Sequence, residues 1–406
     1  MDRIKALMIC GVFAPQNAPE IVRDARKSVE FSANRMQLKL IDGLKQITEL
    51  HVLSAPFIGH YPNQSGRRIF RGFEQPQQLC EYVSFNNLWG YRNLSRARAL
   101  KRRVRDYLRH TEGEKLIVVF SAHDPFLAAA ACAKKLDPRV RVCFVVPDLP
   151  QYMNLEENRG WLYDRAKKYD IRSILAHCRA VDASVVLTAQ MLPVLGLQDR
   201  PHIVAEGVIE DTAASEAKSP VPAKQRKMIL YTGKLYRKFG IPALLEAFSR
   251  MSDPSLRLVL CGAGDAEPEA RAAMERDPRI LCTGQILPEE VSAYLDRADV
   301  LVNPRLNDDA YTKYSFPSKN LDYLLRGKPV VACLLDGMPE IYREFLYEIL
   351  PGPAPAAAIR LALEQALRAP QEEVEVRYRS FLAYAEAHLT VSAIARKIVE
   401  ISLQGQ

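Results

Sequence analysis

Two segments in the second half of the chain combine residue types that can hold a phosphorylated ligand. In the first segment, Gly233 and Lys234 directly follow an apolar run, and Lys238 comes four residues later. If the run is a strand, Gly233 lets the chain leave the sheet without a steric penalty. The two lysines would then lie in a loop at the carboxyl edge of the sheet, where they can neutralise a diphosphate as point charges. A solvated basic loop is the alternative interpretation.

The second segment can supply backbone donors and a carboxylate. Pro317 is well placed at the start of a helix, and Gly327 is well placed at its end. The backbone N–H groups of Ser318 and Lys319 would be free to bind an anion. Asp322 lies about one turn inside this helix and can accept hydrogen bonds from the vicinal hydroxyls of a sugar. The alternative is a surface helix that joins two strands.

Several other kinds of site are missing from the sequence. It contains no P-loop, no GxSxG nucleophile elbow and no pair of aspartates at i, i+2. The segment Cys261–Gly264 follows a strand-like run, but Glu267 occupies the place of the third glycine of a dinucleotide-binding motif. No two of the eight cysteines are closer than eleven residues, which excludes a zinc ribbon or finger.

Composition indicates a globular protein with more than one domain. The 406 residues include 48% hydrophobic residues and carry a formal net charge of +8. This content is ample for packed cores, and the length suggests two or three domains. The run Ala6–Ala14 is expected to be a first core strand rather than part of a signal peptide. We expect a cytoplasmic protein that could contact the inner face of the membrane.

Short apolar runs alternate with helical patterns along the whole chain. Continuous apolar runs suit strands that are buried on both faces, as in parallel sheets. Helices are expected at Asn34–Gln46, Leu94–His110, Asp124–Leu136 and Val391–Leu403. The alternation predicts the α/β class with doubly wound sheets. Twelve strands are expected, at Ile4–Val12, Ile47–Leu53, Leu116–Phe120, Val140–Val146, Ala183–Thr188, Ile203–Ala205, Met228–Thr232, Leu256–Cys261, Ile280–Cys282, Val300–Asn303, Val330–Cys333 and Glu348–Leu350.

The composition divides the chain into two such halves. Residues 208–226 are polar and small and include two prolines, so they are the predicted linker. We expect Rossmann-like domains at residues 1–207 and 227–387, facing each other across a cleft in which a ligand would bind. The final segment, residues 388–406, contains a helix that could pack on either domain.

The motifs of the second half resemble, in order and spacing, the C-terminal domain of the retaining glycosyltransferases of family 4, which have the GT-B fold. The resemblance covers residues 228–340. The first half resembles the family more loosely, through Ser32 and Asn34 at the start of its first helix and through residues 204–209. The matching positions are Gly233, Lys234, Lys238 and Gly240, then Gly262 and Gly264, Thr283 and Gly284, Ala298–Pro304, and finally Asp322, Gly327 and Pro329.

The resemblance implies a reaction and its donor. The enzyme would move a sugar from a nucleoside-diphosphate sugar to a hydroxyl of a glycan or lipid-linked glycan acceptor, with retention of configuration, in polysaccharide biosynthesis. Lys234 and Lys238 would neutralise the leaving diphosphate in place of a metal ion, so no cofactor is expected. The N–H groups of Ser318 and Lys319 would bind the same phosphates, and Asp322 would bind the ribose diol.

The resemblance also implies contacts with the base and the two sugars. Gln285, Ile286 and Leu287 would flank the base. His123 would face the transferred sugar; the alternative is a helix-start histidine beside the Asp124 cap. Ser32 and Asn34 are candidates for the acceptor side.

One position departs from the family pattern. Tyr314 stands where the family has the first glutamate of its E-x7-E motif, which usually contacts the donor sugar. Asp308 or Asp309 could take over this contact, or the backbone could supply it. The departure leaves the donor sugar open and keeps a catalytically inactive sugar- or membrane-binding subunit as an alternative. A nucleotide-sugar epimerase with the same fold is the other alternative.

The acceptor side offers one carboxylate and one basic helix. Asp148 follows a predicted strand and could orient an acceptor hydroxyl, although an ordinary turn aspartate is equally compatible. The segment Arg92–Arg109 has eight basic residues and one acid. We expect its arginines to face outward, either as a solvated face or toward an anionic membrane surface or lipid-diphosphate acceptor. Nucleic acid is not expected, because no RNA-binding aromatic motif accompanies the segment. Its apolar stripe is expected to pack on the N-terminal sheet and consists of Leu94, Ala97, Leu100, Val104 and Leu108.

Overall fold

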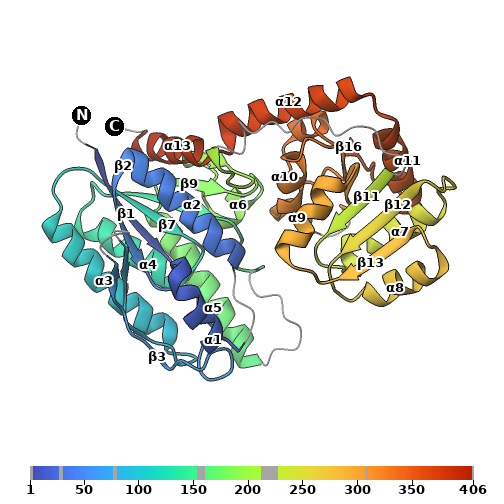
Figure 1. The fold of residues 1–406 in the computed structure, drawn as a ribbon. Helices are drawn as coiled ribbons and strands as arrows, with labels where there is room; N and C mark the ends of the chain where they lie inside the picture. Colours follow the sequence, from blue (N-terminus) through green and yellow to red (C-terminus); the bar gives the residue numbers. More distant parts are fainter. Residues whose placement is uncertain are drawn as a thin grey trace. The chain divides into compact units, whose positions relative to one another are not determined.

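The computed structural model describes residues 3–26, 31–75, 80–152, 161–211, 227–307 and 310–404. The chain forms two compact units, one made of Met1–Glu210 with His388–Gln406 and the other of Asp211–Ala387 (Figure 1). Most of the predicted linker, residues 212–226, lies outside the described residues.

The N-terminal unit is built on a sheet with the strand order β10-β9-β8-β7-β1-β2-β5-β4 among the described residues. All neighbouring strands are parallel except β4 and β5, and β3 forms a separate antiparallel pair with β6. All six strands expected in this half are present. The bounds are β1 (Ile4–Cys10), β2 (Thr48–Ser54), β3 (Ile69–Phe70), β4 (Glu74–Gln75), β5 (Cys80–Tyr82), β6 (Phe85–Asn86), β7 (Lys115–Phe120), β8 (Arg141–Val146), β9 (Ala183–Val186) and β10 (His202–Val204).

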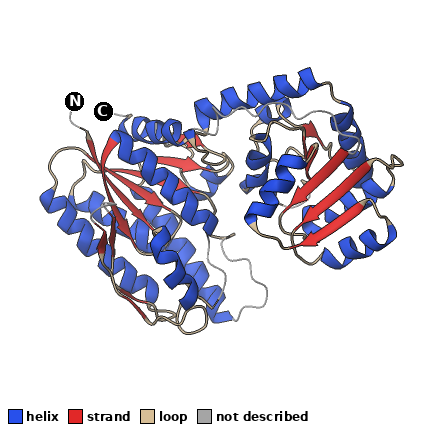
Figure 2. Cartoon of the chain, viewed as in Figure 1, coloured by secondary structure: helices blue, strands red, loops and turns tan. Residues whose placement is uncertain are grey.

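Helices cover both faces of this sheet (Figure 2). Right-handed crossovers that leave β1 and β7 in opposite directions place α2 and α4 on opposite faces. The C-terminal helix α13 packs on α2, where a Cβ at Gly43 would lie only 2.7 Å from Val391 Cγ1. The helices are α1 (Ala18–Asp24), α2 (Phe31–Ile47), α3 (Arg92–His110), α4 (Asp124–Leu136), α5 (Trp161–His177), α6 (Met191–Leu195) and α13 (Val391–Leu403).

The C-terminal unit has a sheet of parallel strands in the order β13-β12-β11-β14-β15-β16 among its described residues. Five of the six expected runs form strands, whereas the expected run Glu348–Leu350 coincides with a strand only at Glu348. The strands are β11 (Lys227–Thr232), β12 (Leu256–Cys261), β13 (Ile280–Gly284), β14 (Val300–Asn303), β15 (Val330–Ala332) and β16 (Tyr347–Glu348). The helices are α7 (Ile241–Ser249), α8 (Glu267–Arg276), α9 (Pro288–Arg297), α10 (Ser318–Leu324), α11 (Pro355–Arg368) and α12 (Gln371–His388).

Each sheet has one point at which the strand order reverses. The reversal lies between β1 and β7 in the N-terminal unit and between β11 and β14 in the C-terminal unit. Open α/β sheets bind ligands outside the carboxyl ends of the strands at such a point, because the loops diverge there. The segments that leave these strands carry Gly11 and His123 in one unit, and Gly233–Gly240 and Arg305 in the other.

Candidate active site

The loop after β11 begins at a glycine that no other residue could replace without strain. Gly233 has φ +126°, and its N–H donates to the Cys261 carbonyl at 2.8 Å. A Cβ on Gly233 would lie 2.1 Å from Cε and 2.4 Å from Nζ of Lys319. The missing side chain therefore creates the space that the Lys319 side chain occupies.

We expect Gly233→Ala to lower the free energy of unfolding by about 1–3 kcal/mol, because alanine at this φ is strained. The new methyl group would also push the Lys319 ammonium out of its place. Urea unfolding measures the loss, with Gly352→Ala as the control, since a Cβ at Gly352 meets no atom within 4 Å. Equal stability of the two variants would contradict the assigned role of Gly233.

Lys319 brings its side chain, and not only its backbone, into the site. Its Nζ lies 3.4 Å from the Tyr231 hydroxyl, 5.1 Å from the centroid of the Tyr231 ring and 5.7 Å from that of Phe239. Burial and the neighbouring charges of Arg305 and Lys234 lower the pKa of Lys319 to about 8, and Asp322 acts in the opposite direction. The sequence had suggested only a backbone role for this residue.

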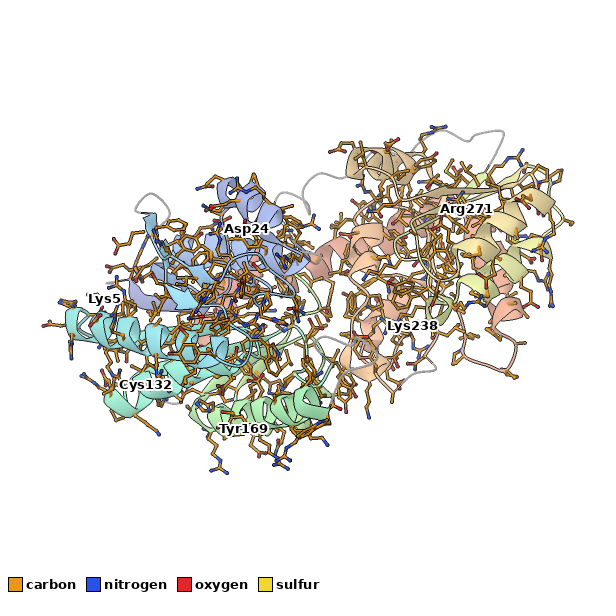
Figure 3. All side chains as sticks on the ribbon, turned by 90° about the horizontal axis from the view of Figure 1, so that it is seen from below. Lys5, Asp24, Cys132, Tyr169, Lys238 and Arg271 are labelled. Carbon is orange, nitrogen blue, oxygen red and sulfur yellow. The ribbon has the colours of Figure 1, made fainter. Side chains whose placement is uncertain are left out.

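The two lysines predicted from the sequence approach one aromatic ring. Nζ of Lys234 lies 5.7 Å and Nζ of Lys238 lies 5.8 Å from the Tyr236 ring centroid. The Lys238 ammonium is also 5.7 Å from the centroid of Phe239. Both side chains are exposed, and Figure 3 marks Lys238 in the C-terminal unit. The structure thus brings Lys234, Lys238 and Lys319 together.

Arg305 joins these lysines, although the sequence analysis missed it. It follows β14, and its guanidinium carbon lies 5.6 Å from the Phe239 ring centroid and 5.3 Å from that of Tyr311. Its Nη2 donates to the Ser315 hydroxyl at 3.0 Å. A signal was available, because a basic residue directly after a predicted strand at the switch point should reach the same sheet edge.

These four residues, Lys234, Lys238, Arg305 and Lys319, form what we call the cation cluster. Among the described residues, none of its three lysines forms an ion pair. Rings attract cations but do not neutralise them, so the like charges still repel one another. The described part of the chain also holds no group of three or more His, Cys, Asp or Glu side chains suited to a metal ion. The arrangement is chemically suited to an anionic ligand with several oxygens, such as a diphosphate.

Helix α10 is fixed to both central strands of its sheet. The Tyr323 hydroxyl accepts a hydrogen bond from the Thr232 N–H at 2.9 Å, which ties the helix to the end of β11. Asn320 Oδ1 accepts from Asn303 Nδ2 at 2.8 Å, which ties it to the end of β14. Asp322 therefore lies on an anchored helix with its side chain exposed, as binding of a diol requires.

The other donor-side predictions are less closely connected to the cluster. Gln285, Ile286 and Leu287 follow β13, which β12 separates from β11, and the Leu287 side chain is 66% exposed. Tyr314 lies in a short 3₁₀ turn, with Lys313 Nζ 5.0 Å from its ring centroid. Asp308 and Asp309 lie outside the described residues.

His123 sits at the switch point of the N-terminal unit. It lies at the start of α4, but it is itself the N-cap residue and Asp124 is the first residue of the helix, so the Asp124 cap of the alternative interpretation is not formed. The His123 ring packs on Phe57 and Phe126 with centroid separations of 4.8 and 5.6 Å. Burial and the charges of Arg96 and Arg92 lower the pKa of His123 to about 3. The imidazole is therefore neutral at physiological pH, and it can exchange hydrogen bonds with a hydroxyl without carrying charge.

The acceptor-side candidates have different surroundings. Asn34 is buried and uses both amide atoms on Phe13: Oδ1 accepts from the N–H and Nδ2 donates to the carbonyl, each at 2.9 Å. Gln37, which the sequence analysis did not single out, accepts from the Gly11 N–H at 2.9 Å. These two amides shape the loop after β1. Asp148 is exposed in the turn after β8, and the Ser32 side chain lies outside the described residues.

The prediction that the arginines of α3 face outward is wrong for Arg96. This side chain is 3% exposed, because the Pro56 carbonyl and the Phe85 ring supply partners inside the unit. The apolar stripe is also shorter than expected, since Leu94 is 48% exposed while Ala97, Leu100 and Val104 are buried. The exposed arginines of the helix are Arg98, Arg102, Arg105 and Arg109.

Comparison with known proteins gives a family for one segment and a fold for the chain. Residues 226–368 match the glycosyl transferases group 1 family. A curated relative is the putative teichuronic acid biosynthesis glycosyltransferase TuaH of Bacillus subtilis strain 168. It is 23% identical over 162 residues, which cover 39% of this chain and 40% of that protein. The match therefore spans about two fifths of the relative's length.

Solved structures resemble the chain over nearly its whole length. Anabaena HepE in complex with UDP shares 14% identity, covering 98% of this chain and 99% of that one, with a TM-score of 0.60. Sucrose-phosphate synthase of Thermosynechococcus elongatus shares 15%, covering 98% of each chain, with a TM-score of 0.58. Trehalose 6-phosphate synthase of Burkholderia multivorans also shares 15%, covering 98% and 96%, with a TM-score of 0.61. At these identities the likeness concerns the fold, and it confirms the expected GT-B class.

Proposed function

We propose that this chain transfers a sugar from a nucleoside-diphosphate sugar to a hydroxyl group. The match of residues 226–368 to the glycosyl transferases group 1 family and the GT-B fold support the proposal. The acceptor would be a glycan or lipid-linked glycan of polysaccharide biosynthesis. The observation that carries the proposal is the cation cluster at the β11/β14 switch point. The description of TuaH as a teichuronic acid biosynthesis glycosyltransferase supports a polymer as the product.

The proposed chemistry retains the configuration of the sugar. The bond between the anomeric carbon and the diphosphate oxygen breaks, and the diphosphate leaves with the electron pair. The acceptor hydroxyl attacks the resulting oxocarbenium-like centre on the same face, and its proton passes to a diphosphate oxygen. The cation cluster would stabilise the negative charge that develops on the leaving group, without a metal ion. Asp322 would hold the ribose, and His123 would contact the sugar as a neutral hydrogen-bonding group.

Release of nucleoside diphosphate from a panel of nucleotide sugars tests this function. The reaction should proceed in a chelator, require a glycan acceptor for rapid turnover and yield the retained anomer. Conversion of the donor alone to an isomer would instead identify an epimerase. Nucleotide binding without any turnover would favour the non-catalytic alternative that Tyr314 raises.

Affinity for a nucleoside diphosphate should depend on the protonation of Lys319. Its pKa in the free protein is about 8, and an anionic ligand binds the protonated form. Affinity is therefore expected to be highest near pH 7 and to fall as the pH rises through 8, by up to tenfold per unit. Calorimetric titrations between pH 7 and 9.5 measure this slope. The slope should vanish in Lys319→Met; an unchanged slope would assign the titration to another group.

We also propose that α3 contacts an anionic membrane surface. Its exposed arginines are Arg98, Arg102, Arg105 and Arg109, and Trp89 and Leu94 are exposed at the N-terminal end of the helix. No helix among the described residues is long and apolar enough to cross a membrane. Helix α3 would bind the membrane through the attraction of its arginines to anionic headgroups and through shallow insertion of its exposed apolar side chains.

Replacing these four arginines by glutamine should remove most binding to phosphatidylglycerol vesicles. Each basic residue near such a surface contributes about 1 kcal/mol, and the attraction weakens with salt. Vesicle sedimentation at two ionic strengths measures the effect, with neutral phosphatidylcholine vesicles as the control. Binding that survives both the substitutions and high salt would place the membrane contact elsewhere.

A further inference from the structure

We infer that Arg92 and Arg96 are positioning residues for His123, acting together on the loop Pro56–Ile58 so that Phe57 covers one face of the imidazole. The inference rests on the proposed function only in giving His123 a role in transfer. The contacts that support it all lie within the N-terminal unit.

The two arginines hold the loop on either side of Phe57. Nη2 of Arg96 donates to the Pro56 carbonyl at 2.6 Å, and Nη1 of Arg92 donates to the Ile58 carbonyl at 3.1 Å. The arginines are four residues apart on α3, so they lie on the same face of the helix, one turn apart. Two adjacent turns of one helix therefore hold the carbonyl groups of the residues before and after Phe57.

Phe57 has little freedom to move within this arrangement. Its N–H donates to the Gly11 carbonyl at 3.0 Å, and a Cβ on Gly11 would lie 2.4 Å from the Phe57 ring. The Phe57 ring centroid also lies 4.8 Å from that of His123 and 5.8 Å from that of Phe126. The glycine thus leaves room for the aromatic ring, and the ring in turn fixes the imidazole.

The positive charges of Arg92 and Arg96 act on His123 in addition to the hydrogen bonds that these residues donate to the carbonyl groups. Within the described ranges neither guanidinium forms an ion pair, and the buried Arg96 Nε has no hydrogen-bond partner. A buried charge without an opposite charge beside it is costly, and neutral side chains could bind the carbonyls at lower cost. Next to His123, however, the two cations disfavour an imidazolium.

Two carboxyl groups lie in the same region, and one of them, Asp170, partly balances the charge of Arg92. Asp124 follows His123 on α4, and Asp170 of α5 accepts a hydrogen bond from Asn93 of α3 at 3.3 Å. Burial and the proximity of Asp124 raise the pKa of Asp170 to about 6. The arginines still dominate at His123, whose pKa they lower together with burial. Arg92 and Arg96 would therefore fix both the place of the imidazole ring and its neutral state.

The test compares Arg96→Met and Arg92→Met with Arg98→Met, an exposed arginine on the same helix, and with the conservative Arg96→Lys. The first readout is the titration of the His123 imidazole by NMR, assigned by its loss in His123→Gln. We expect the pKa of His123 to rise by at least one unit in Arg96→Met, to rise less in Arg96→Lys and to stay unchanged in Arg98→Met. This readout needs no activity, so it also holds if the proposed function fails.

The second readout separates turnover from binding. In Arg96→Met and Arg92→Met, kcat should fall about 10- to 100-fold, as expected when a reacting partner is displaced by about 1 Å. The affinity for nucleoside diphosphate, set by the other unit, should stay within twofold of wild type. An unchanged His123 titration would overturn the inference, and so would an unchanged kcat in an active enzyme. If Arg96→Met does not fold, Arg92→Met and Arg96→Lys carry the same comparison.

Discussion

Lys238→Ala is expected to lower kcat about 10²- to 10³-fold. The lysine would face the diphosphate as it leaves, and loss of one preorganised donor to a developing charge typically has this effect. The backbone of its loop is constrained two residues later, where Gly240 has φ +79° and a Cβ would lie 2.1 Å from the Pro304 carbonyl oxygen. Steady-state rates of nucleoside diphosphate release measure the change.

Lys227→Ala is the matched control for this variant. Lys227 begins β11, whose carboxyl end leads to Lys238, and it is exposed, with its Nζ donating to the Leu367 carbonyl. The Lys227→Ala enzyme should therefore keep the kcat of the wild type. A Lys238→Ala enzyme with wild-type kcat would exclude the lysine from the reaction.

Lys319→Met is expected to weaken the binding of nucleoside diphosphate about 10- to 100-fold. A hydrogen bond to a charged group contributes about 1.5–3 kcal/mol, which corresponds to this range of affinity. The methionine should still pack on Tyr231 and Phe239, so the variant should fold. Calorimetric titration in a chelator measures the dissociation constant.

A second substitution at the same position serves as the control. Lys319→Arg keeps the charge but needs more room than the space beside Gly233 provides, so it should restore affinity only in part. Wild-type affinity in Lys319→Met would mean that the ammonium does not meet the ligand.

Most strands of the two sheets could be predicted because the central strands are buried on both faces. Such strands appear in the sequence as continuous apolar runs, and eleven of the twelve expected runs form strands; the run Glu348–Leu350 coincides with β16 only at Glu348. The short strands β3, β4, β5 and β6 have only two or three residues each, too few for a periodic pattern. Their formation depends on neighbours that are distant in the sequence.

The candidate site was predicted where one segment carries its own signal. Gly233, Lys234 and Lys238 stand in one loop, and the structure places the two lysines at one ring. Lys319 and Arg305 reach the same place from two other segments, and only the strand order shows that β11 and β14 are neighbours. Spacing alone could not reveal this convergence.

The inward turn of Arg96 was unpredictable for a similar reason. The sequence of a helix with eight basic residues and one acid predicts that most of its surface is solvated. Only the fold brings the Pro56 carbonyl and the Phe85 ring to the position of Arg96. A buried polar side chain needs partners for its polar atoms, and the partners of Arg96 lie far away in the sequence.

Binding of UDP, GDP, ADP and CDP in the presence of a chelator tests the central claim most directly. A ligand that binds the native state raises the apparent melting temperature by mass action. One of these diphosphates should stabilise the wild type without metal, and the shift should be lost in Lys234→Ala and Lys238→Ala but kept in Lys227→Ala. Stabilisation by none of them, or equal stabilisation of all four proteins, would contradict the assignment of the cation cluster to a nucleoside-diphosphate sugar.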